Sequence, residues 1–419
     1  MRIQSKNLVL FLSAITIFYF SPAIAQKHAS TKSDLTGNFS QIMHRLDSLA
    51  NIKDTKQRKK QIEAFWASLV KKKQIPLVEK DSVAFLYKGE ADSVFWQGDF
   101  NGWGSLAGGH IFNNRGYRIG KSDIWRMKAA FPPNARIDYK IVLNGHTWIT
   151  DPANPNQQWG GSGPNSELRM PEWKPEPISL NRNEVAKGRL SENVLSSSQS
   201  MGYTINYKVY TPSNYDQLSD LPVIYVTDGQ EYADEKMGAM IHVLDNLIAD
   251  QVIKPVIAVF IDPREAGNAG NNRRMFELPL NDRFVEFITK ELIPAVDSNY
   301  KTNPLAEARA IMGTSLGGLN AAYVGVKASD KMSLIAIHSP SFWYRPQIYG
   351  MFEDSPTLPL KIFMSTGVIS DTEEGARRMK AIMEEKNYAL EYREINEGHS
   401  WGNWRSLIDD ILVYFFAAK

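Results

Sequence analysis

A sharp turn from a strand into a helix is encoded by Gly313-Thr314-Ser315-Leu316-Gly317-Gly318. The β-like run 308–312 precedes this stretch, and the helical pattern 319–327 follows it. Small residues on both sides of Ser315 let the chain turn tightly, so that the serine hydroxyl projects above the edge of the sheet. A glycine-rich entry into an ordinary helix is the alternative interpretation. The strand–turn–helix context favours a serine nucleophile.

On either side of this turn, β-like runs alternate with helical patterns over residues 178–419. The predicted strands are 203–210, 222–227, 255–261, 308–312, 333–337, 361–365 and 390–395. Helical periodicity separates most of them, for example over 282–293 and 374–386. This alternation predicts a doubly wound α/β domain with a mainly parallel sheet.

A serine nucleophile requires a base, and the base requires a group that orients it. When the serine lies on such a turn, the chain order is serine, acid, histidine. Asp371 follows the next-to-last predicted strand and His399 follows the last one, so we predict them as the acid and the base. Glu373 and Glu374 are alternative acids, although both suit the first turn of a helix. An N-cap is the alternative role for Asp371.

Two further histidines of this region suit structural roles. His338 follows Ser315 too closely to leave room for the acid, and His242 precedes the serine inside a predicted helix. Two backbone N–H groups are expected to stabilise the oxyanion, one from the residue after the serine and one from an earlier loop. Leu316 and Gln230 are the predicted donors, and a plain tight turn before Gln230 is compatible with that role.

Composition excludes several classes of protein. The 419 residues include 48 basic and 46 acidic side chains, a balance of +2 that indicates no nucleic-acid partner. Cysteine is absent, which excludes disulfides, thiolate catalysis and cysteine-bound metals. Serine-based chemistry needs no metal and no organic cofactor, so none is predicted.

The first 25 residues have the order of a signal peptide. Arg2 and Lys6 precede an apolar run over 8–20, and the small-residue stretch 21–25 ends before Gln26. The protein is therefore predicted to be exported, to the periplasm or the extracellular space. A membrane anchor and a buried first helix are the alternatives, but the run is short for a membrane span. We expect no membrane span in the mature protein.

Two smaller regions precede the α/β domain. Apolar residues at helical spacing predict a helical arm over 26–78. Over 79–177, short β-like runs at 83–87, 93–96 and 138–143, separated by turn signals, predict a small β-sandwich. The glycine-rich stretch 160–164 and the proline-rich stretch 171–177 are interpreted as a loop and a linker.

The motifs around these residues resemble a known family. Asp228-Gly229-Gln230, the 313–318 turn and 398–405 resemble the putative-esterase branch of the α/β-hydrolases. That branch includes enterochelin esterases, carbohydrate esterase family 1 feruloyl esterases, S-formylglutathione hydrolases and mycolyltransferases. In it, the residue after Asp-Gly supplies an oxyanion N–H, which supports Gln230.

The region before the α/β domain carries resemblances of its own. Residues 151–155, 160–163 and 168–171 are similar to the join between the two domains of enterochelin esterases. The motif 98–103 is similar to an early-set sandwich of the glycogen-binding type, carbohydrate-binding module 48. Enterochelin esterases with such a domain are typically cytoplasmic. The predicted export of this chain therefore favours a plant-polysaccharide ester as substrate.

Candidate substrate contacts are cationic and aromatic. Arg273 and Arg274 lie in a glycine- and asparagine-rich loop and suit a carboxylate, a phenolate or a ferric catecholate, with a solvated loop as the alternative. Aromatic side chains predicted to form walls for a phenolic acyl group or a sugar are Trp343, Trp401, Trp404, Trp159 and Trp103. Burial in a core is an equally good interpretation of Trp404 and Trp103.

The leading hypothesis is a serine carboxylic-ester hydrolase acting on feruloyl or related esters of plant polysaccharide. A ferric catecholate trilactone esterase is the close alternative, and an acyltransferase is a third variant. A carbohydrate-binding platform without catalysis belongs to another class, and the complete serine–acid–histidine set argues against it. The expected partners are a small-molecule or oligosaccharide ester and, for the β-sandwich, a glycan. The sequence does not indicate an oligomeric state.

Overall fold

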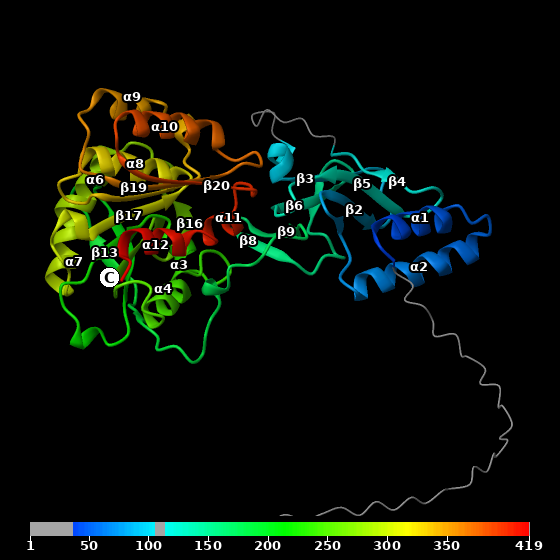
Figure 1. Ribbon diagram of the computed structural model, residues 1–419, viewed down its shortest axis with the longest axis horizontal. Helices are drawn as coiled ribbons and strands as arrows, with labels where there is room; N and C mark the ends of the chain where they lie inside the picture. The colour runs from blue at the N-terminus through cyan, green and yellow to red at the C-terminus, as the bar shows by residue number, and fades with distance from the viewer. Residues whose placement is uncertain (1–36, 105–113, 419) are drawn as a thin grey trace, which may run out of the picture.

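The computed structural model describes residues 37–104 and 114–418, so the signal-peptide prediction for 1–25 lies outside the described residues. The molecule is elongated: a large α/β domain forms one end, two smaller sheets form the middle, and two helices form the other end (Figure 1). Within the described ranges, no helix combines the length and apolar character needed to cross a membrane.

The α/β domain is built on a nine-stranded sheet in the order β10-β12-β14-β13-β17-β18-β19-β20, with β11 paired to β12. Neighbours from β14 to β20 run parallel, whereas β10, β11 and β12 pair antiparallel at one edge. The strands are β10 (Arg189–Leu190), β11 (Val194–Ser197), β12 (Thr204–Thr211), β13 (Val223–Val226), β14 (Ile257–Asp262), β17 (Arg309–Thr314), β18 (Leu334–His338), β19 (Lys361–Gly367) and β20 (Ala389–Ile395). This doubly wound, mainly parallel sheet confirms the predicted α/β-hydrolase fold.

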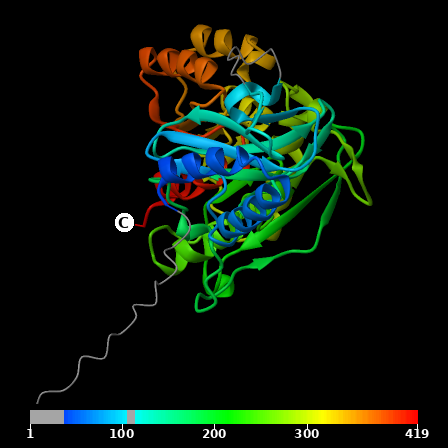
Figure 2. The same cartoon turned by 90° about the vertical axis from the view of Figure 1, so that its right-hand side faces the viewer.

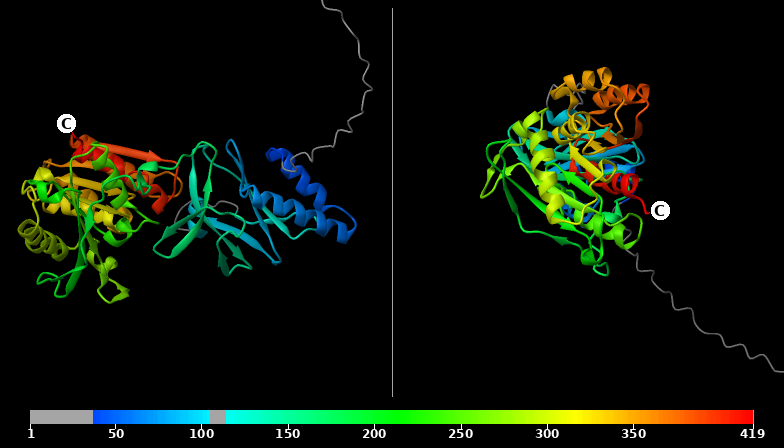
Figure 3. Two further views of the ribbon diagram at one scale, coloured as in Figure 1. Left: turned by 90° about the horizontal axis from the view of Figure 1, so that it is seen from below. Right: turned by 90° about the vertical axis from the view of Figure 1, so that its left-hand side faces the viewer.

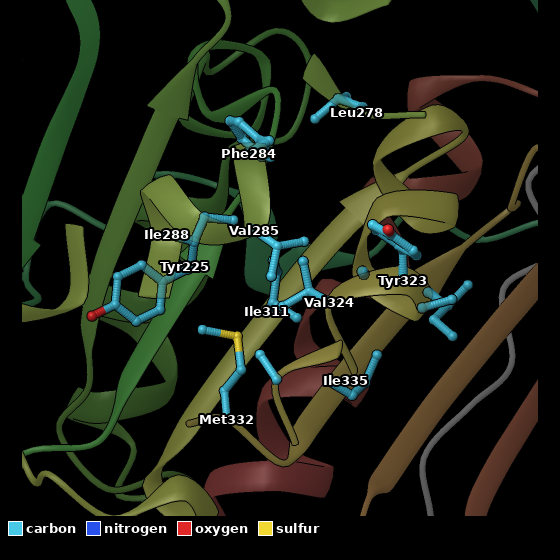
Figure 4. Packing of buried hydrophobic residues seen from close by; sticks show 14 of the residues in the cluster. Tyr225, Leu278, Phe284, Val285, Ile288, Ile311, Tyr323, Val324, Met332 and Ile335 are labelled. Carbon is cyan, nitrogen blue, oxygen red and sulfur yellow. The ribbon is translucent and has the colours of Figure 1, made fainter. Parts of the chain in front are cut away.

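Helices cover both faces of the sheet because its central strands are apolar on both sides. One face packs against α6 (Asp282–Glu286), α7 (Ile293–Asn299), α8 (Leu316–Lys327), α9 (Gln347–Asp354) and α10 (Glu373–Glu385). Figure 4 shows part of this core, where Ile311 lies beside Val324. The other face packs against α3 (Gly229–Ala233), α4 (Met240–Ala249), α11 (Trp401–Arg405) and α12 (Ile408–Phe416). The predicted helix 282–293 contains a π-helical turn over Phe287–Leu292.

The glycine- and asparagine-rich loop after β14 contains a short hairpin of β15 (Arg264–Glu265) and β16 (Asn268–Asn272). A short helix, α5 (Arg274–Glu277), follows the hairpin directly. The loop therefore places Arg273 at the N-cap of α5 and Arg274 at its first residue.

The middle of the molecule is a β-sandwich, seen end-on in Figure 2. One sheet contains β1 (Leu77–Glu79), β2 (Ser82–Lys88), β5 (Ile124–Ala130) and β4 (Tyr117–Arg118). The other contains β3 (Val94–Gly98), β6 (Arg136–Leu143), β9 (Gly163–Arg169), β8 (Gln157–Gly160) and, paired with β6, β7 (Thr147–Ile149). Buried aromatic side chains from both sheets fill the space between them, including Phe85, Trp96 and Tyr139.

Two antiparallel helices, α1 (Phe39–Ala50) and α2 (Thr55–Lys71), pack against the sandwich at the end away from the α/β domain (Figure 3). Leu46 of α1, Leu69 of α2 and Leu86 of β2 belong to one buried cluster. Asn38 and Gln41 form a capping box that starts α1.

The stretch 160–164, predicted as a loop, closes the hairpin between β8 and β9. Gly160 pairs with Gly163, and Gly163 has a φ of 95°, which a residue with a side chain rarely adopts. Glycine-rich composition suits a tight turn as well as a linker. The hairpin contacts the α/β domain, where Gln158 donates to the Lys236 carbonyl at 3.0 Å and accepts from Arg405 at 2.6 Å.

Candidate active site

Ser315 lies between β17 and α8 in a backbone conformation that side chains rarely adopt, with φ 60° and ψ −114°. Its N–H donates to the His338 carbonyl at 2.9 Å, which holds the turn against β18. A Cβ atom on Gly317 would lie 2.5 Å from Thr227 Oγ1, so this position has no room for a side chain. The structure thus places Ser315 on a sharp turn between strand and helix.

Asp371 and His399 are hydrogen-bonded, with 2.6 Å between Asp371 Oδ1 and His399 Nδ1. The Asp371 side chain is fully buried, whereas that of His399 is 35% exposed. The second carboxylate oxygen accepts from the Gly367 N–H and the Ser339 hydroxyl, each at 2.6 Å. These bonds fix the carboxylate so that Oδ1 remains available to the imidazole.

The alternative acids occupy the positions expected of helix-start residues. Glu373 and Glu374 lie in the first turn of α10, and Glu373 accepts the backbone N–H of Asp371 at 3.0 Å. The N-cap of α10 is Thr372, not Asp371. Of the three candidate carboxylates, the one that contacts His399 is therefore Asp371.

The hydrogen bond recorded for Ser315 Oγ goes to Ser341 Oγ at 3.0 Å, not to His399. Ser315 and His399 nevertheless line one pocket of about 290 Å³. We call it the interdomain pocket because both the sandwich and the α/β domain contribute to it. Its lining residues are Asp138, Trp159, Gly160, Gly161, Asn165, Asp228, Glu231, Arg274, Thr314, Ser315, His399, Ser400, Trp401 and Trp404.

The predicted oxyanion donors occupy equivalent positions on adjacent parallel strands. Val226 of β13 pairs with Met312 of β17, and Gln230 and Leu316 each lie four residues beyond that pair. Neither backbone N–H donates a hydrogen bond to any described residue. Gln230 lines a separate cavity of about 260 Å³ and not the interdomain pocket. The two N–H groups therefore remain available at neighbouring ends of the sheet.

The structure separates the two adjacent arginines. Arg274 lines the interdomain pocket, and its Nε lies 2.9 and 2.8 Å from the two oxygens of Asp228. Arg273 lies outside that pocket, pairs with Glu265 at 3.3 Å and stacks over Tyr203. Arg274 therefore lies in the pocket, whereas Arg273 supports the neighbouring loop, and substrate binding by either stays a prediction.

Some of the tryptophans predicted to form aromatic walls line the pocket, and others do not. Trp401 and Trp404 line the pocket although each is buried, and the Trp404 ring meets the His399 ring edge-on at 4.9 Å. Trp159 reaches the pocket from β8, under the Lys236 ammonium. Trp343 is 71% exposed and does not line the pocket. Trp103 donates to Asp99 in the sandwich at 3.1 Å.

Four polar lining residues were not singled out from the sequence: Asp138, Asn165, Glu231 and Ser400. Glu231 and Ser400 are direct neighbours of Gln230 and His399, and that adjacency was the available signal. Asp138 and Asn165 belong to sandwich strands, and no local pattern indicates that these strands face a distant serine.

Burial sets the electrostatics of the pocket and its surroundings. It raises the pKa of Asp228 and Glu231, while Arg274 opposes the shift at Asp228. Burial lowers the pKa of His338 to about 3, so this histidine is neutral, and its Nδ1 lies 2.9 Å from Ser365 Oγ. Over residues 37–104 and 114–418, acidic and histidine side chains form no cluster suited to a metal ion.

Esterases are among the known proteins that are similar to this chain. Residues 198–359 match the family described as Putative esterase. An endo-1,4-beta-xylanase/feruloyl esterase of Xylanibacter ruminicola is 23% identical over 71% of this chain and 41% of its own length. An iron(III) enterobactin esterase of Escherichia coli is 24% identical over 47% of this chain and 47% of its own length. The alignments thus span less than half of either relative.

Solved structures show the same fold. The ferric enterobactin esterase of Salmonella typhimurium has a TM-score of 0.71 at 19% identity, covering 84% of this chain and 98% of that one. The enterobactin esterase of Shigella flexneri has a TM-score of 0.65 at 19% identity, covering 79% of this chain and 92% of that one. Over residues 198–359 this chain is thus similar to the Putative esterase family, its fold is that of the enterobactin esterases, and these likenesses support a carboxylic ester hydrolase.

Proposed function

We propose that the protein hydrolyses esters through an acyl-enzyme formed on Ser315, with His399 as base and Asp371 as the group that orients it. The observation that carries the proposal is the 2.6 Å contact between Asp371 and His399, beside a serine on a strained turn in the same pocket. Ser315 Oγ attacks the ester carbonyl carbon as its proton passes to His399 Nε2. The Gln230 and Leu316 N–H groups stabilise the oxyanion of the tetrahedral intermediate.

The acyl-enzyme forms when that intermediate collapses and His399 returns the proton to the departing alcohol. Water then attacks the acyl carbon with His399 as base, releasing the acid and restoring Ser315. For the first step, Ser315 Oγ must rotate away from Ser341, its partner in this structure. Catalytic hydrogen bonds of this kind often tighten only when substrate is bound.

The proposed substrate is a feruloyl or related acyl ester of a plant polysaccharide. Three carboxylates line the interdomain pocket. Asp138 is paired with Arg136 and Asp228 with Arg274, which leaves Glu231 without a cationic partner among the described residues. A ferric catecholate complex is polyanionic, so this balance disfavours it. Neutral sugar hydroxyls instead find hydrogen-bonding partners on Asn165 and the carboxylates, and Trp159 offers an aromatic face.

The likeness to the solved ferric enterobactin esterase of Salmonella typhimurium supports the ferric catecholate trilactone as the second candidate substrate. It extends over 84% of this chain and therefore includes the sandwich as well as the α/β domain. We propose further that residues 79–177 form an early-set unit of the glycogen-binding type, with residues 26–78 as a helical arm before it. The signal-like order of residues 1–25 supports export to the periplasm or beyond.

A comparison of rates tests the function and the substrate together. Purified protein beginning at Gln26 would be assayed on a feruloylated arabinoxylan oligosaccharide and on a ferric catecholate trilactone, with Ser315→Ala as control. We expect faster, Ser315-dependent cleavage of the feruloyl ester. Faster trilactone cleavage would reverse the choice of substrate, and turnover that survives in Ser315→Ala would refute the mechanism. Recovery from cells of a chain that still begins at Met1 would refute export.

A further inference from the structure

The loop that carries His399 is held from outside the α/β domain. Strand β6 of the sandwich runs beside it: the Arg136 N–H donates to the Asn396 carbonyl at 3.2 Å, and Arg136 forms a parallel bridge with Glu397. Asn396 also donates its side-chain amide to Asn134 at 2.7 Å. The chain segment just before His399 is thus aligned by a strand of the sandwich.

The Arg136 side chain strengthens this attachment on both sides of the histidine. Its Nη1 lies 3.2 Å from Glu397 Oε2 and 3.2 Å from Ser400 Oγ, two residues before and one residue after His399. The guanidinium is fully buried, and its other nitrogens donate to Glu167 and, at 2.6 Å, to Asp138. A buried guanidinium that donates to four different side chains restricts the position of each group it binds.

Glu397 has no side-chain partner within the α/β domain. Its carboxylate accepts from Arg136 at 3.2 Å and from the Trp173 indole at 3.1 Å, and both residues precede that domain. Glu397 is 4% exposed, so water does not replace these partners. The buried carboxylate therefore depends on the sandwich and the segment after it.

Two glycines of this loop lie where the sandwich has no room for a side chain. A Cβ atom on Gly402 would overlap the Arg136 guanidinium, and one on Gly398 would overlap the side chain of Asp99. Glycine at these two positions allows sandwich side chains to pack directly against the backbone on both sides of His399. The sandwich thus contacts the loop backbone closely on both sides of His399, and Arg136 also binds the loop through Glu397 and Ser400.

We propose that Arg136 is a positioning residue for catalysis, holding Glu397 and Ser400 so that His399 faces Ser315. This inference rests on the proposed function, because it assigns to the sandwich a share in placing the base. A displacement of about 1 Å in a catalytic group reduces the rate by about 100-fold. The substrate need not touch the sandwich for this effect to appear.

The test uses the full mature chain and a small aryl acetate, with Arg136→Met and the milder Glu397→Gln. We expect kcat to fall about 100-fold in Arg136→Met and at least about tenfold in Glu397→Gln, with KM within about twofold. Arg136→Lys should recover part of the loss. Arg126→Met is the matched control, because Arg126 pairs with Asp47 at 3.0 Å on the far side of the sandwich. Near-ultraviolet circular dichroism would establish that each variant is folded.

A second readout separates this inference from the proposed function. The downfield proton NMR signal of the His399–Asp371 hydrogen bond reports the position of the imidazole without turnover. We expect the signal in the wild type and its loss or shift in Arg136→Met. Folded variants with unchanged kcat and an unchanged signal would overturn the inference, as would a rise in KM at constant kcat. Absence of Ser315-dependent turnover in the wild type would instead refute the proposed function.

Discussion

Ser341 contacts Ser315 twice: the two hydroxyl oxygens lie 3.0 Å apart, and the Ser341 N–H donates to the Ser315 carbonyl at 3.0 Å. The backbone contact fixes the loop after β18 against the strained turn. The hydroxyl contact orients Ser315 Oγ toward Ser341, and under the proposed mechanism Ser315 must leave this orientation to deliver its proton to His399.

Ser341→Ala should therefore accelerate acylation of Ser315. A neutral hydrogen bond contributes about 0.5–1.5 kcal/mol, so removing this one should accelerate acylation by about two- to tenfold. The measurement is pre-steady-state acylation by an aryl acetate. A slower rate in the folded variant would show instead that Ser341 assists the reaction.

Asp371→Asn should lower kcat by about 10⁴-fold, because an amide in place of the carboxylate favours the wrong tautomer of His399. Steady-state hydrolysis of an aryl acetate gives the comparison. Glu374→Gln provides the control, since Glu374 is exposed in the first turn of α10 and should retain full activity. Equal losses in the two variants would contradict the assignment of the acid.

Trp159→Ala should weaken binding of a feruloylated oligosaccharide and leave a small aryl acetate unaffected. An aromatic contact contributes about 0.5–1.5 kcal/mol, so KM for the oligosaccharide should rise by up to about tenfold. Trp148 lies on β7, is 47% exposed and does not line the pocket, so Trp148→Ala serves as the control. Unchanged KM values for both substrates would exclude Trp159 from the binding surface.

Arg274→Met should reduce both stability and activity. The substitution leaves the buried Asp228 carboxylate without its cation, at a cost of about 2–3 kcal/mol because the Arg274 side chain is 24% exposed. Asp228 is the N-cap of α3, which contains Gln230, so kcat should fall as well. Urea unfolding and aryl acetate kinetics measure the two effects. Arg273→Met, at the adjacent position outside the pocket, should retain its kcat.

Glu277→Gln should change how stability depends on pH. Burial raises the pKa of Glu277 from 4.5 to about 7, against an opposing hydrogen bond from Tyr203 at 3.0 Å. The folded state therefore binds this proton more tightly than the unfolded state, so its contribution is present below pH 4.5 and is lost as pH rises through 7.

In the wild type this loss amounts to about 3 kcal/mol of unfolding free energy, from 1.36 kcal/mol per pKa unit. Glu277→Gln should remove that part of the pH dependence. Urea unfolding of both proteins at pH 5 and pH 8 provides the measurement. Parallel pH profiles for the two proteins would show that Glu277 does not titrate in this range.

Local patterns were sufficient to predict the fold class. Strands β13 and β17 are buried throughout and appear in the sequence as apolar runs, and the glycines around Ser315 mark the turn that follows β17. Because parallel strands end at one edge of the sheet, the loops after β19 and β20 were expected to bring Asp371 and His399 together. The roles of these residues stay predictions until the variants are measured.

Contacts between distant segments were beyond the reach of local patterns. Arg136 and Glu397 are 261 residues apart, and their contact depends on how the sandwich sits against the sheet. Arg273 and Arg274 are adjacent in the sequence, yet the geometry of α5 directs them to different partners. Ser341 follows a strand in a loop of ordinary composition, so nothing in the sequence distinguished it.

The loop that carries His399 couples the contacts of the sandwich to the arrangement of the active site. If the hydrogen bonds from Arg136 to Glu397 and Ser400 stabilise the reactive arrangement of the imidazole, occupation of that arrangement must stabilise those hydrogen bonds by the same free energy. A covalent transition-state analogue on Ser315 would then slow hydrogen exchange in β6, well outside the domain that it modifies. The rate of hydrogen exchange in the sandwich would then depend on whether the active site is occupied.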